Sequence, residues 1–560
     1  MENTAMSERL RDHWLTVDLR SVALFRVTIG IVLLLHFSDR WRLSDDFYGP
    51  AGALPAALVS SANEIPRFPT ALTVIESYPG GMTVFFAVAI GAFAALTAGL
   101  FARWSALLSL IAFSSLAHRN PYVLIGGDYV LGSMLLWMQV LPIADRYSLD
   151  ALRRRRNGRE LPDARSTSQA RPSIAAFGVL LQLGLIYLAT AWQKTGSTWW
   201  QDGTALSHVL GMQRFLRPGA ELVGQLPESW LALLTRAVLV FEYLVLPLIL
   251  LPMARPWLRR AALLGLVGLH LGIASVLDAG VFSIAMLACL PLLLSKEDWE
   301  WAFRLVGRVA LPSGAASAPR FFGEFMVNGR GLMDRVQNRL LTLNLRPSTL
   351  NLPGADATPL ENLLSSRVRH ITRVAVTELA SLWLLLGMVA ASYNINFAVA
   401  NREVSLSPLD LPQRFAAAYQ RWDMFTPDAP KCDPRLLVRV RLLDGRLLTM
   451  SGDDRSPAAG MDLAPRFDSF AWRIYLWHAI LPHDPQRQAE VEPLRTELCR
   501  FLTREWAAGG QPAQDIFTVE LWARSVPTRP LPGQPSSTAE PYWISSLDLA
   551  AERRERLAQR

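Results

Sequence analysis

Long apolar runs separated by short basic loops fill the first two thirds of the chain. About nine runs have the composition of membrane helices, near residues 20–38, 80–99, 103–118, 126–143, 173–194, 230–251, 259–277, 280–295 and 373–393. A bilayer core takes roughly 20 apolar residues per helix, and fewer where neighbouring helices shield the ends. The pattern therefore predicts a mainly α-helical, polytopic membrane bundle.

Basic residues between these runs predict how the bundle is oriented. With nine crossings, one side of the membrane receives the N-terminal arginines, Arg103, "RRRRNGRE" at 153–160, "RPWLRR" at 255–260 and the arginine-rich segment 296–372. Loops rich in lysine and arginine stay cytoplasmic. We therefore expect a multi-pass protein of the cell's inner (plasma) membrane, with a cytoplasmic N-terminus and an extracytoplasmic C-terminal domain.

The remainder of the chain has the pattern of a small α+β domain. "RLLVRVRLLDGRLLTM" (435–450) alternates apolar and polar residues on both sides of Asp444-Gly445, which is a two-residue hairpin signal. "FAWRIYLWHAI" and "AEVEPLRTELCRFLTREWAAG" have helical spacing, and "DIFTVELWARSV" (515–526) is typical of a strand. The expected domains are a membrane domain with about eight spans (1–300), a cytoplasmic insert (301–372), a ninth span (373–393), a soluble α+β domain (394–526) and a loosely ordered tail (527–560).

Composition narrows the class of protein further. Hydrophobic residues make up 51% of the chain and charged residues 19%, which is too apolar for an ordinary soluble domain. The net charge of +8 is spread over loops rather than along a stripe with stacking aromatics, so we expect no nucleic-acid partner. The three cysteines, Cys289, Cys432 and Cys499, do not have the spacing of metal ligands. The sequence allows a Cys432–Cys499 disulfide if both residues face an oxidising compartment, and it does not decide whether this bond forms.

Several polar residues occur where lipid would penalise them. An ionisable group inside a span costs at least about 2.5 kcal/mol and usually faces a cavity or a partner, so we expect these residues to converge inside the bundle. Glu242 needs a partner from another helix, for which Arg26 and His270 are candidates. Arg26 and His36 also fit a structural or interfacial position, and His270, between Gly268 and Gly272, also fits a helix–helix hydrogen bond. The set comprises Arg26, His36, Gln182, Lys194, Glu242, His270 and Asp278.

Lys194 is the leading candidate for chemistry. It ends the apolar run "LIYLATAWQ" and precedes "TGSTWWQDG". One interpretation is an interfacial lysine anchored beside Trp199 and Trp200. The other is a lysine in a pocket of low dielectric, where the amine can lose its proton and serve as a general base. The outer segment "HRNPYVLIGGDYVLG" (118–132) adds Asn120 and Asp128 as supporting polar groups.

Taken together, these segments resemble a known family. "FYGPAGALP", "HRNPYVLIGGDYVLG", "YLATAWQKTGSTWWQDGTAL" and "HLGIASVLDAGVFSIAML" are similar to the HTTM domain, which bacterial proteins share with the vitamin K-dependent gamma-glutamyl carboxylase. The resemblance covers about residues 15–300. "YQRWDMFTPDAP" (419–430) is similar to the extracytoplasmic tail of bacterial HTTM proteins.

The resemblance implies a role for Lys194. In the carboxylase, a lysine in the segment matching "AWQKTG" deprotonates the reduced vitamin K quinol, so Lys194 takes the place of the base, with menaquinol or vitamin K hydroquinone as the candidate quinol. The chain also departs from the carboxylase: it has no histidine in "LIGGDYV", and 394–560 does not match the carboxylase's large substrate-recruiting region.

Two functions follow as hypotheses. The first is a quinol- or lipid-linked oxidoreductase or carboxylase-like enzyme, with Lys194 as base and Asn120, Asp128, Glu242, His270 and Arg26 around its pocket. The second is a non-catalytic maturation or assembly factor whose outer domain binds an exported protein client. Transport ranks last because the sequence has no inverted repeat. Walker, GxGxxG, GxSxG and HExxH motifs are also absent.

Overall fold

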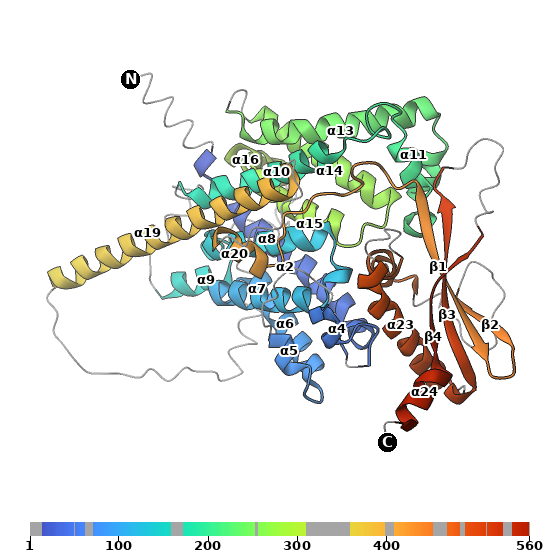
Figure 1. Cartoon of the computed structure of the whole chain (residues 1–560). Coiled ribbons are helices and arrows are strands. Elements are labelled where there is room, and N and C mark those ends of the chain that lie inside the picture. The colour runs from blue at the N-terminus through green and yellow to red at the C-terminus, as the bar shows by residue number, and fades with distance from the viewer. Residues whose placement is uncertain are drawn as a thin grey trace, which may run out of the picture.

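The computed structural model is mainly helical, with a four-stranded antiparallel sheet at one side of the helices (Figure 1). It describes residues 14–49, 51–61, 71–157, 172–252, 256–309, 359–397, 408–451, 467–481, 488–510, 512–529 and 540–558. Most of the expected cytoplasmic insert 301–372 lies outside the described residues.

The helices up to the end of the bundle are α2 (Leu19–Arg42), α3 (Ser44–Phe47), α4 (Ala56–Ser61), α5 (Ala71–Ile75), α6 (Gly81–Ala98), α7 (Ala102–Arg119), α8 (Gly126–Val140), α9 (Leu149–Arg156), α10 (Ile174–Gln193), α11 (Ala205–Leu210), α12 (Gly219–Gly224), α13 (Glu228–Leu250), α14 (Trp257–Val276), α15 (Phe282–Cys289), α16 (Lys296–Val309) and α19 (Pro359–Ser392).

Within the described residues, six helices are long and apolar enough to cross a membrane: α2, α6, α10, α13, α14 and α19. The protein is therefore a multi-pass membrane protein. The expected spans at 103–118, 126–143 and 280–295 correspond to α7, α8 and α15 with the 3-10 helix Leu290–Leu293. The 15 residues of α8 rise only about 22 Å, less than the roughly 30 Å of a hydrocarbon core. The nine-span arrangement stays a prediction.

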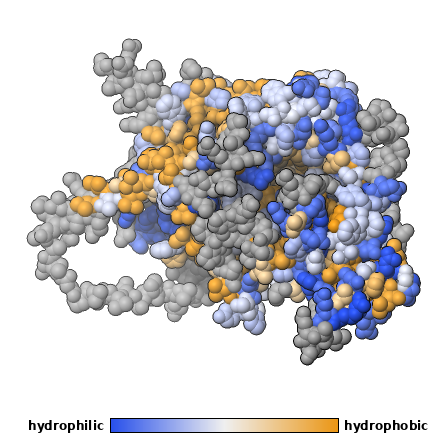
Figure 2. Space-filling model, viewed as in Figure 1, coloured by the Kyte–Doolittle hydropathy of each residue, from blue (hydrophilic) through white to orange (hydrophobic). Residues whose placement is uncertain are grey.

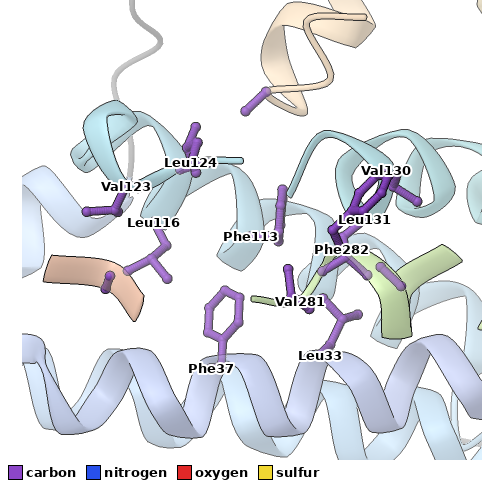
Figure 3. Close-up of a cluster of buried hydrophobic side chains, with 14 of the residues drawn as sticks. Leu33, Phe37, Phe113, Leu116, Val123, Leu124, Val130, Leu131, Val281 and Phe282 are labelled. Atoms are coloured by element: carbon purple, nitrogen blue, oxygen red, sulfur yellow. The ribbon is translucent and has the colours of Figure 1, made fainter. Parts of the chain in front are cut away.

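Apolar side chains on several helices form one buried core. Leu33 and Phe37 on α2 meet Phe113 on α7 and Phe282 at the start of α15 (Figure 3). Apolar residues also lie on the molecular surface over α19 and its neighbours, whereas hydrophilic residues gather over the sheet and over the region of α11 beside it (Figure 2). This division fits a bundle in lipid joined to a domain in water.

The C-terminal sheet is built from β1 (Cys432–Leu442), β2 (Leu447–Ser451), β3 (Ile516–Pro527) and β4 (Tyr542–Asp548), in the order β2-β1-β3-β4. The expected hairpin is confirmed, with Gly445 at φ 88° in its turn. The other elements of this part are α20 (Leu411–Phe415), α22 (Phe470–Tyr475), α23 (Gln488–Ala508) and α24 (Leu549–Ala558). Residues 540–558 were expected in a loosely ordered tail. They instead form β4 and α24, because β4 extends the sheet by pairing with β3.

Residues 408–431, here called the connecting segment, join α19 to β1 and do not lie freely outside the bundle. Ala416, Ala417 and Ala418 are fully buried. The His118 ring nitrogen Nε2 lies 3.0 Å from the carbonyl oxygen of Arg414, and Gln182 Nε2 donates to Gln420 Oε1 at 2.8 Å. Irregular backbone is tolerated among membrane helices only where protein groups satisfy its hydrogen bonds. Polar residues such as Gln182 meet that need.

Candidate functional site

The Lys194 amine is turned into the bundle and bonded to Glu242. Lys194 caps the C-terminal end of α10, and its Nζ lies 2.8 Å from Glu242 Oε1 and 2.7 Å from Oε2. Only 4% of Lys194 and 7% of Glu242 are exposed. The expectation that Glu242 pairs with Arg26 or His270 is wrong, because the two helices that pack at this point, α10 and α13, present Lys194 and Glu242 to one another.

The packing of α13 explains where Glu242 points. The buried residues of this helix recur every three or four positions, so they form one stripe along it. Glu242 lies on this stripe between Leu239 and Val245, both of which are fully buried. Gly184 of α10 faces Leu246 so closely that a Cβ would lie 2.3 Å from its Cδ1. A small residue at this contact lets the helices approach.

Trp199 and Trp200, expected as a pair of interfacial anchors, have different surroundings. The ring of Trp199 is 6% exposed, and Lys194 Nζ lies 4.2 Å from its centroid, which is a cation–π contact. Trp200 is 46% exposed, and its ring lies 6.1 Å from that of Tyr243. The Tyr243 hydroxyl donates to the carbonyl oxygen of Ala191. Trp199 therefore covers the ion pair, while Trp200 faces outward.

The "TGST" residues after Lys194 bind the connecting segment. Asp428 Oδ1 accepts hydrogen bonds from the Thr198 backbone N–H at 2.9 Å and from the Thr198 hydroxyl at 2.8 Å. The Gly196 N–H donates to the carbonyl oxygen of Pro427. The Trp199 indole N–H donates to the carbonyl oxygen of Phe425 at 3.0 Å. Sequence reasoning missed Asp428, since more than 200 residues separate it from its partner.

Tyr187 and His270 form a second buried polar contact beside the ion pair. The Tyr187 hydroxyl lies 2.6 Å from His270 Nε2, and both residues are buried. Within the described part of the chain, His270 Nδ1 has no hydrogen-bond partner. Tyr187 precedes Lys194 by two helical turns on α10, and Glu242 lies within electrostatic range of its phenol. Residues seven positions apart lie on the same face of a helix, so the spacing between Tyr187 and Lys194 could have predicted that Tyr187 lies near the pair.

Asp128 belongs to a separate group at the N-terminal end of α8. Its Oδ1 lies 2.8 Å from His36 Nε2, and its Oδ2 lies 3.9 Å from the Arg40 guanidinium and accepts the Ile125 N–H. These residues line a cavity of about 10 Å³, enough for about one water molecule. Asn120 caps the 3-10 helix Pro121–Val123 through its Oδ1. His36 therefore has a buried carboxylate as its partner, and its place at the membrane interface stays a prediction.

The remaining candidates lie elsewhere. Arg26 donates to the carbonyl oxygens of Ile143 and Tyr147, where α2 passes the end of α8. Asp278 is bonded to Arg217 at 2.9 Å and to Arg473 of α22. The polar residues thus form several local groups rather than the single convergent site that the hydropathy pattern suggested.

Among the described residues, no set of three or more His, Cys, Asp or Glu side chains is arranged to hold a metal ion. Cys289, Cys432 and Cys499 are all free, with only Cys432 exposed. The disulfide that the sequence left open is not formed.

The groups around Lys194 lie in a part of the chain that matches a known family model. The HTTM domain model matches residues 14–299, just over half of the chain. The chain belongs to the HTTM family. This domain is found in vitamin K-dependent carboxylase-like proteins. No curated protein and no solved structure matches the chain. Lys194, Glu242, Tyr187 and His270 all lie within the HTTM match, whereas Asp428 lies beyond it.

Proposed function

We propose that this HTTM protein is a membrane enzyme that removes a proton from a weakly acidic, lipid-soluble substrate, with Lys194 as the base. The observation that carries the proposal is the buried Lys194–Glu242 pair, in which both carboxylate oxygens lie within 2.8 Å of the amine. A buried pair is costly to desolvate and is a weak source of stability. Buried and closely paired ionisable side chains are therefore candidates for functional groups.

Glu242 allows Lys194 to act as a base without contact with bulk water. An ammonium group cannot accept a proton, so Lys194 must first pass one from Nζ to a carboxylate oxygen of Glu242. The neutral amine then takes the proton of a substrate hydroxyl, which leaves an ammonium beside a carboxylic acid. The Trp199 ring, 4.2 Å from Nζ, stabilises the positive charge that this step adds. The donor–acceptor distances of 2.7 and 2.8 Å suit direct transfer.

The chemistry of the groups near the pair suits a quinol. Trp199, whose ring covers Lys194 Nζ, belongs to a buried apolar cluster with Ala191, Leu239 and Ala429. Binding sites for such ligands combine apolar groups with a few convergent polar ones. A quinol such as menaquinol or vitamin K hydroquinone would bring an acidic hydroxyl and an apolar ring, and when bound it would supply the redox chemistry. Lys194 and Glu242 would hold its hydroxyl.

The lipid-facing helices support entry of such a substrate from the bilayer. α13 contains Glu242 and exposes Leu233, Val240 and Leu244 on its other faces. We further propose nine crossings of the inner membrane, with a cytoplasmic N-terminus. Contacts support this orientation: Arg26 meets Ile143 and Tyr147 at the arginine-rich end, whereas Trp472 of α22 donates to Asp46 at the other. The sheet domain would then be extracytoplasmic.

A maturation or assembly factor is the alternative function. The observation that favours it is the sheet edge: β4 is an outer strand, and its Tyr542 and Trp543 are 39% and 56% exposed. Exposed strand edges can bind an extended peptide of a client protein. This function predicts that Lys194→Gln leaves client maturation intact.

Proton transfer can be tested without an oxidant. Full-length protein in lipid nanodiscs is mixed anaerobically with vitamin K hydroquinone, and the absorbance of the hydroquinone anion is recorded. We expect anion formation with wild type and its loss in K194Q and E242Q. K296Q and E300Q are matched controls, because Lys296 and Glu300 form an exposed pair at 3.8 Å. Anion formation by K194Q equal to wild type would rule out Lys194 as the base.

A further inference from the structure

Thr198 is held from two sides by the connecting segment. Its backbone N–H and its hydroxyl both donate to Asp428 Oδ1, while its hydroxyl oxygen accepts the N–H of Ala429 at 3.1 Å. Thr198 is 1% exposed. Hydrogen bonds to a carboxylate are about twice as strong as neutral ones. Asp428 is therefore the principal attachment between this loop and the segment that leads into β1.

Gly196 shows how closely the loop after α10 approaches the connecting segment. A Cβ at this position would lie 2.1 Å from Asp428 Oδ1, so any other residue would displace the carboxylate. The Gly196 N–H also donates to the Pro427 carbonyl oxygen at 2.9 Å. The glycine in "KTGST" is therefore needed for the docking of Asp428, and not only for a turn at the end of α10.

This docking determines where Trp199 lies. Trp199 follows Thr198 directly, its indole N–H is bonded to the Phe425 carbonyl oxygen, and its ring covers Lys194 Nζ. Ala429 completes the apolar cluster around that ring. If Asp428 released Thr198, the loop from residue 195 to 199 would lose its strongest attachment, and water would reach the Lys194–Glu242 pair.

We propose that Asp428 is a positioning residue for Lys194: it holds Thr198, and through it Trp199, so that the connecting segment keeps the ion pair dry. This inference deepens the proposed function and rests on it for its catalytic meaning. Asp428 lies outside the HTTM match, which covers residues 14–299. On this inference, the site in the HTTM domain is complete only when the connecting segment is present.

The charge on Asp428 supports this role. Burial raises the pKa of its carboxyl, but the hydrogen bonds from Thr198 and the nearby Lys431 ammonium outweigh that effect and hold the pKa below its ordinary value. Lys431 Nζ lies 3.7 Å from Asp428 Oδ2. The carboxylate is therefore ionised at neutral pH and accepts both Thr198 hydrogen bonds in its charged form.

The test measures access to Lys194 rather than turnover. Full-length protein in nanodiscs is treated with an amine-selective reagent, and peptide mass spectrometry compares labelling of Lys194 with that of exposed Lys296. We expect D428A to raise the Lys194 labelling rate about tenfold or more, since a charged hydrogen-bond acceptor is lost. D428N keeps an acceptor oxygen and should restore most of the protection. T198V, which loses only the hydroxyl, should be intermediate.

D423A is the matched control, because Asp423 is an acidic residue of the same connecting segment that pairs with Arg421 at the surface. It should label like wild type. Equal labelling of Lys194 in D428A, T198V and wild type, at unchanged thermal unfolding temperatures, would overturn the inference. The two proposals fail separately: raised labelling in D428A, combined with normal hydroquinone deprotonation in K194Q, would retain the positioning role and remove the base.

Discussion

Two buried cations in this bundle have opposite kinds of partner. Lys194 faces a carboxylate, and its Nζ lies within 2.8 Å of both Glu242 oxygens. Arg26 is fully buried and donates instead to two backbone carbonyl oxygens, those of Ile143 and Tyr147. A guanidinium keeps its proton under all ordinary conditions, whereas a buried lysine can lose one. The lysine pair is the arrangement that the proposed base chemistry needs, whereas the arginine contacts hold helix ends together.

The largest effect should come from breaking the lysine pair on one side. E242A leaves the Lys194 amine buried with no carboxylate, which we expect to lower the free energy of unfolding by about 3–5 kcal/mol. The double variant K194M/E242L should be closer to wild type than E242A, because neither charge is left alone. Thermal unfolding in nanodiscs measures both. A double variant whose loss equals the summed losses of K194M and E242L would show that the two side chains do not interact.

Replacing lysine by arginine at position 194, and arginine by lysine at position 26, separates the effect on folding stability from the effect on proton transfer. K194R keeps a charge opposite Glu242 but cannot release its proton, so it should fold and fail to deprotonate vitamin K hydroquinone. R26K cannot reach both carbonyl oxygens, so we expect a loss of about 1–3 kcal/mol with proton transfer retained. Unfolding and hydroquinone absorbance are measured on the same samples. Deprotonation of the hydroquinone by K194R would show that the base is not the side chain at position 194.

A smaller effect should appear as a pH dependence of the connecting segment. The pKa of Asp428 is lower in the folded protein than its value of about 3.9 in the unfolded chain. The ionised carboxylate therefore stabilises the folded protein above that pH, and this stabilisation is lost as the pH falls through the folded-state pKa. We expect the difference in thermal unfolding temperature between wild type and D428A to be constant above about pH 5 and to vanish in stronger acid. A difference that grows on acidification would have the wrong sign.

The smallest effect should come from the exposed pair that resembles Lys194–Glu242 in type only. Lys296 and Glu300 are about half exposed and lie 3.8 Å apart on α16. Water screens such pairs, so K296Q/E300Q should change the free energy of unfolding by no more than about 0.5 kcal/mol. A loss as large as that of E242A would show that burial does not distinguish the two pairs.

Local patterns predicted much of the fold. The run that ends α10 stops at Lys194, as expected, and Asp444-Gly445 marks the turn between β1 and β2. Patterns of this kind depend on neighbouring residues, which the sequence displays directly. The strand β4 was missed, because its short run follows a Pro- and Ser-rich stretch and gains its conformation by pairing with β3.

The candidate site was predicted only in its parts. Glu242 was recognised as a buried charge in need of a partner, but the choice of Lys194 depends on how α10 and α13 are rotated and at what depth they meet. His36 and Asp128 are 92 residues apart, and only the packing of α2 against α8 brings them within 2.8 Å. Neither contact leaves a periodic signal in the chain.

A multi-pass HTTM protein with a hairpin-containing C-terminal region could be predicted from the residues alone, because hydropathy, turn chemistry and the resembling segments are all local properties. The packing of distant elements brings Lys194 to Glu242, places the connecting segment among the helices, and sets Asp428 against Thr198. The physical reason is the same in each case. Buried polar groups must find partners at hydrogen-bonding distance, and which groups meet depends on the packing of elements that are far apart in the chain.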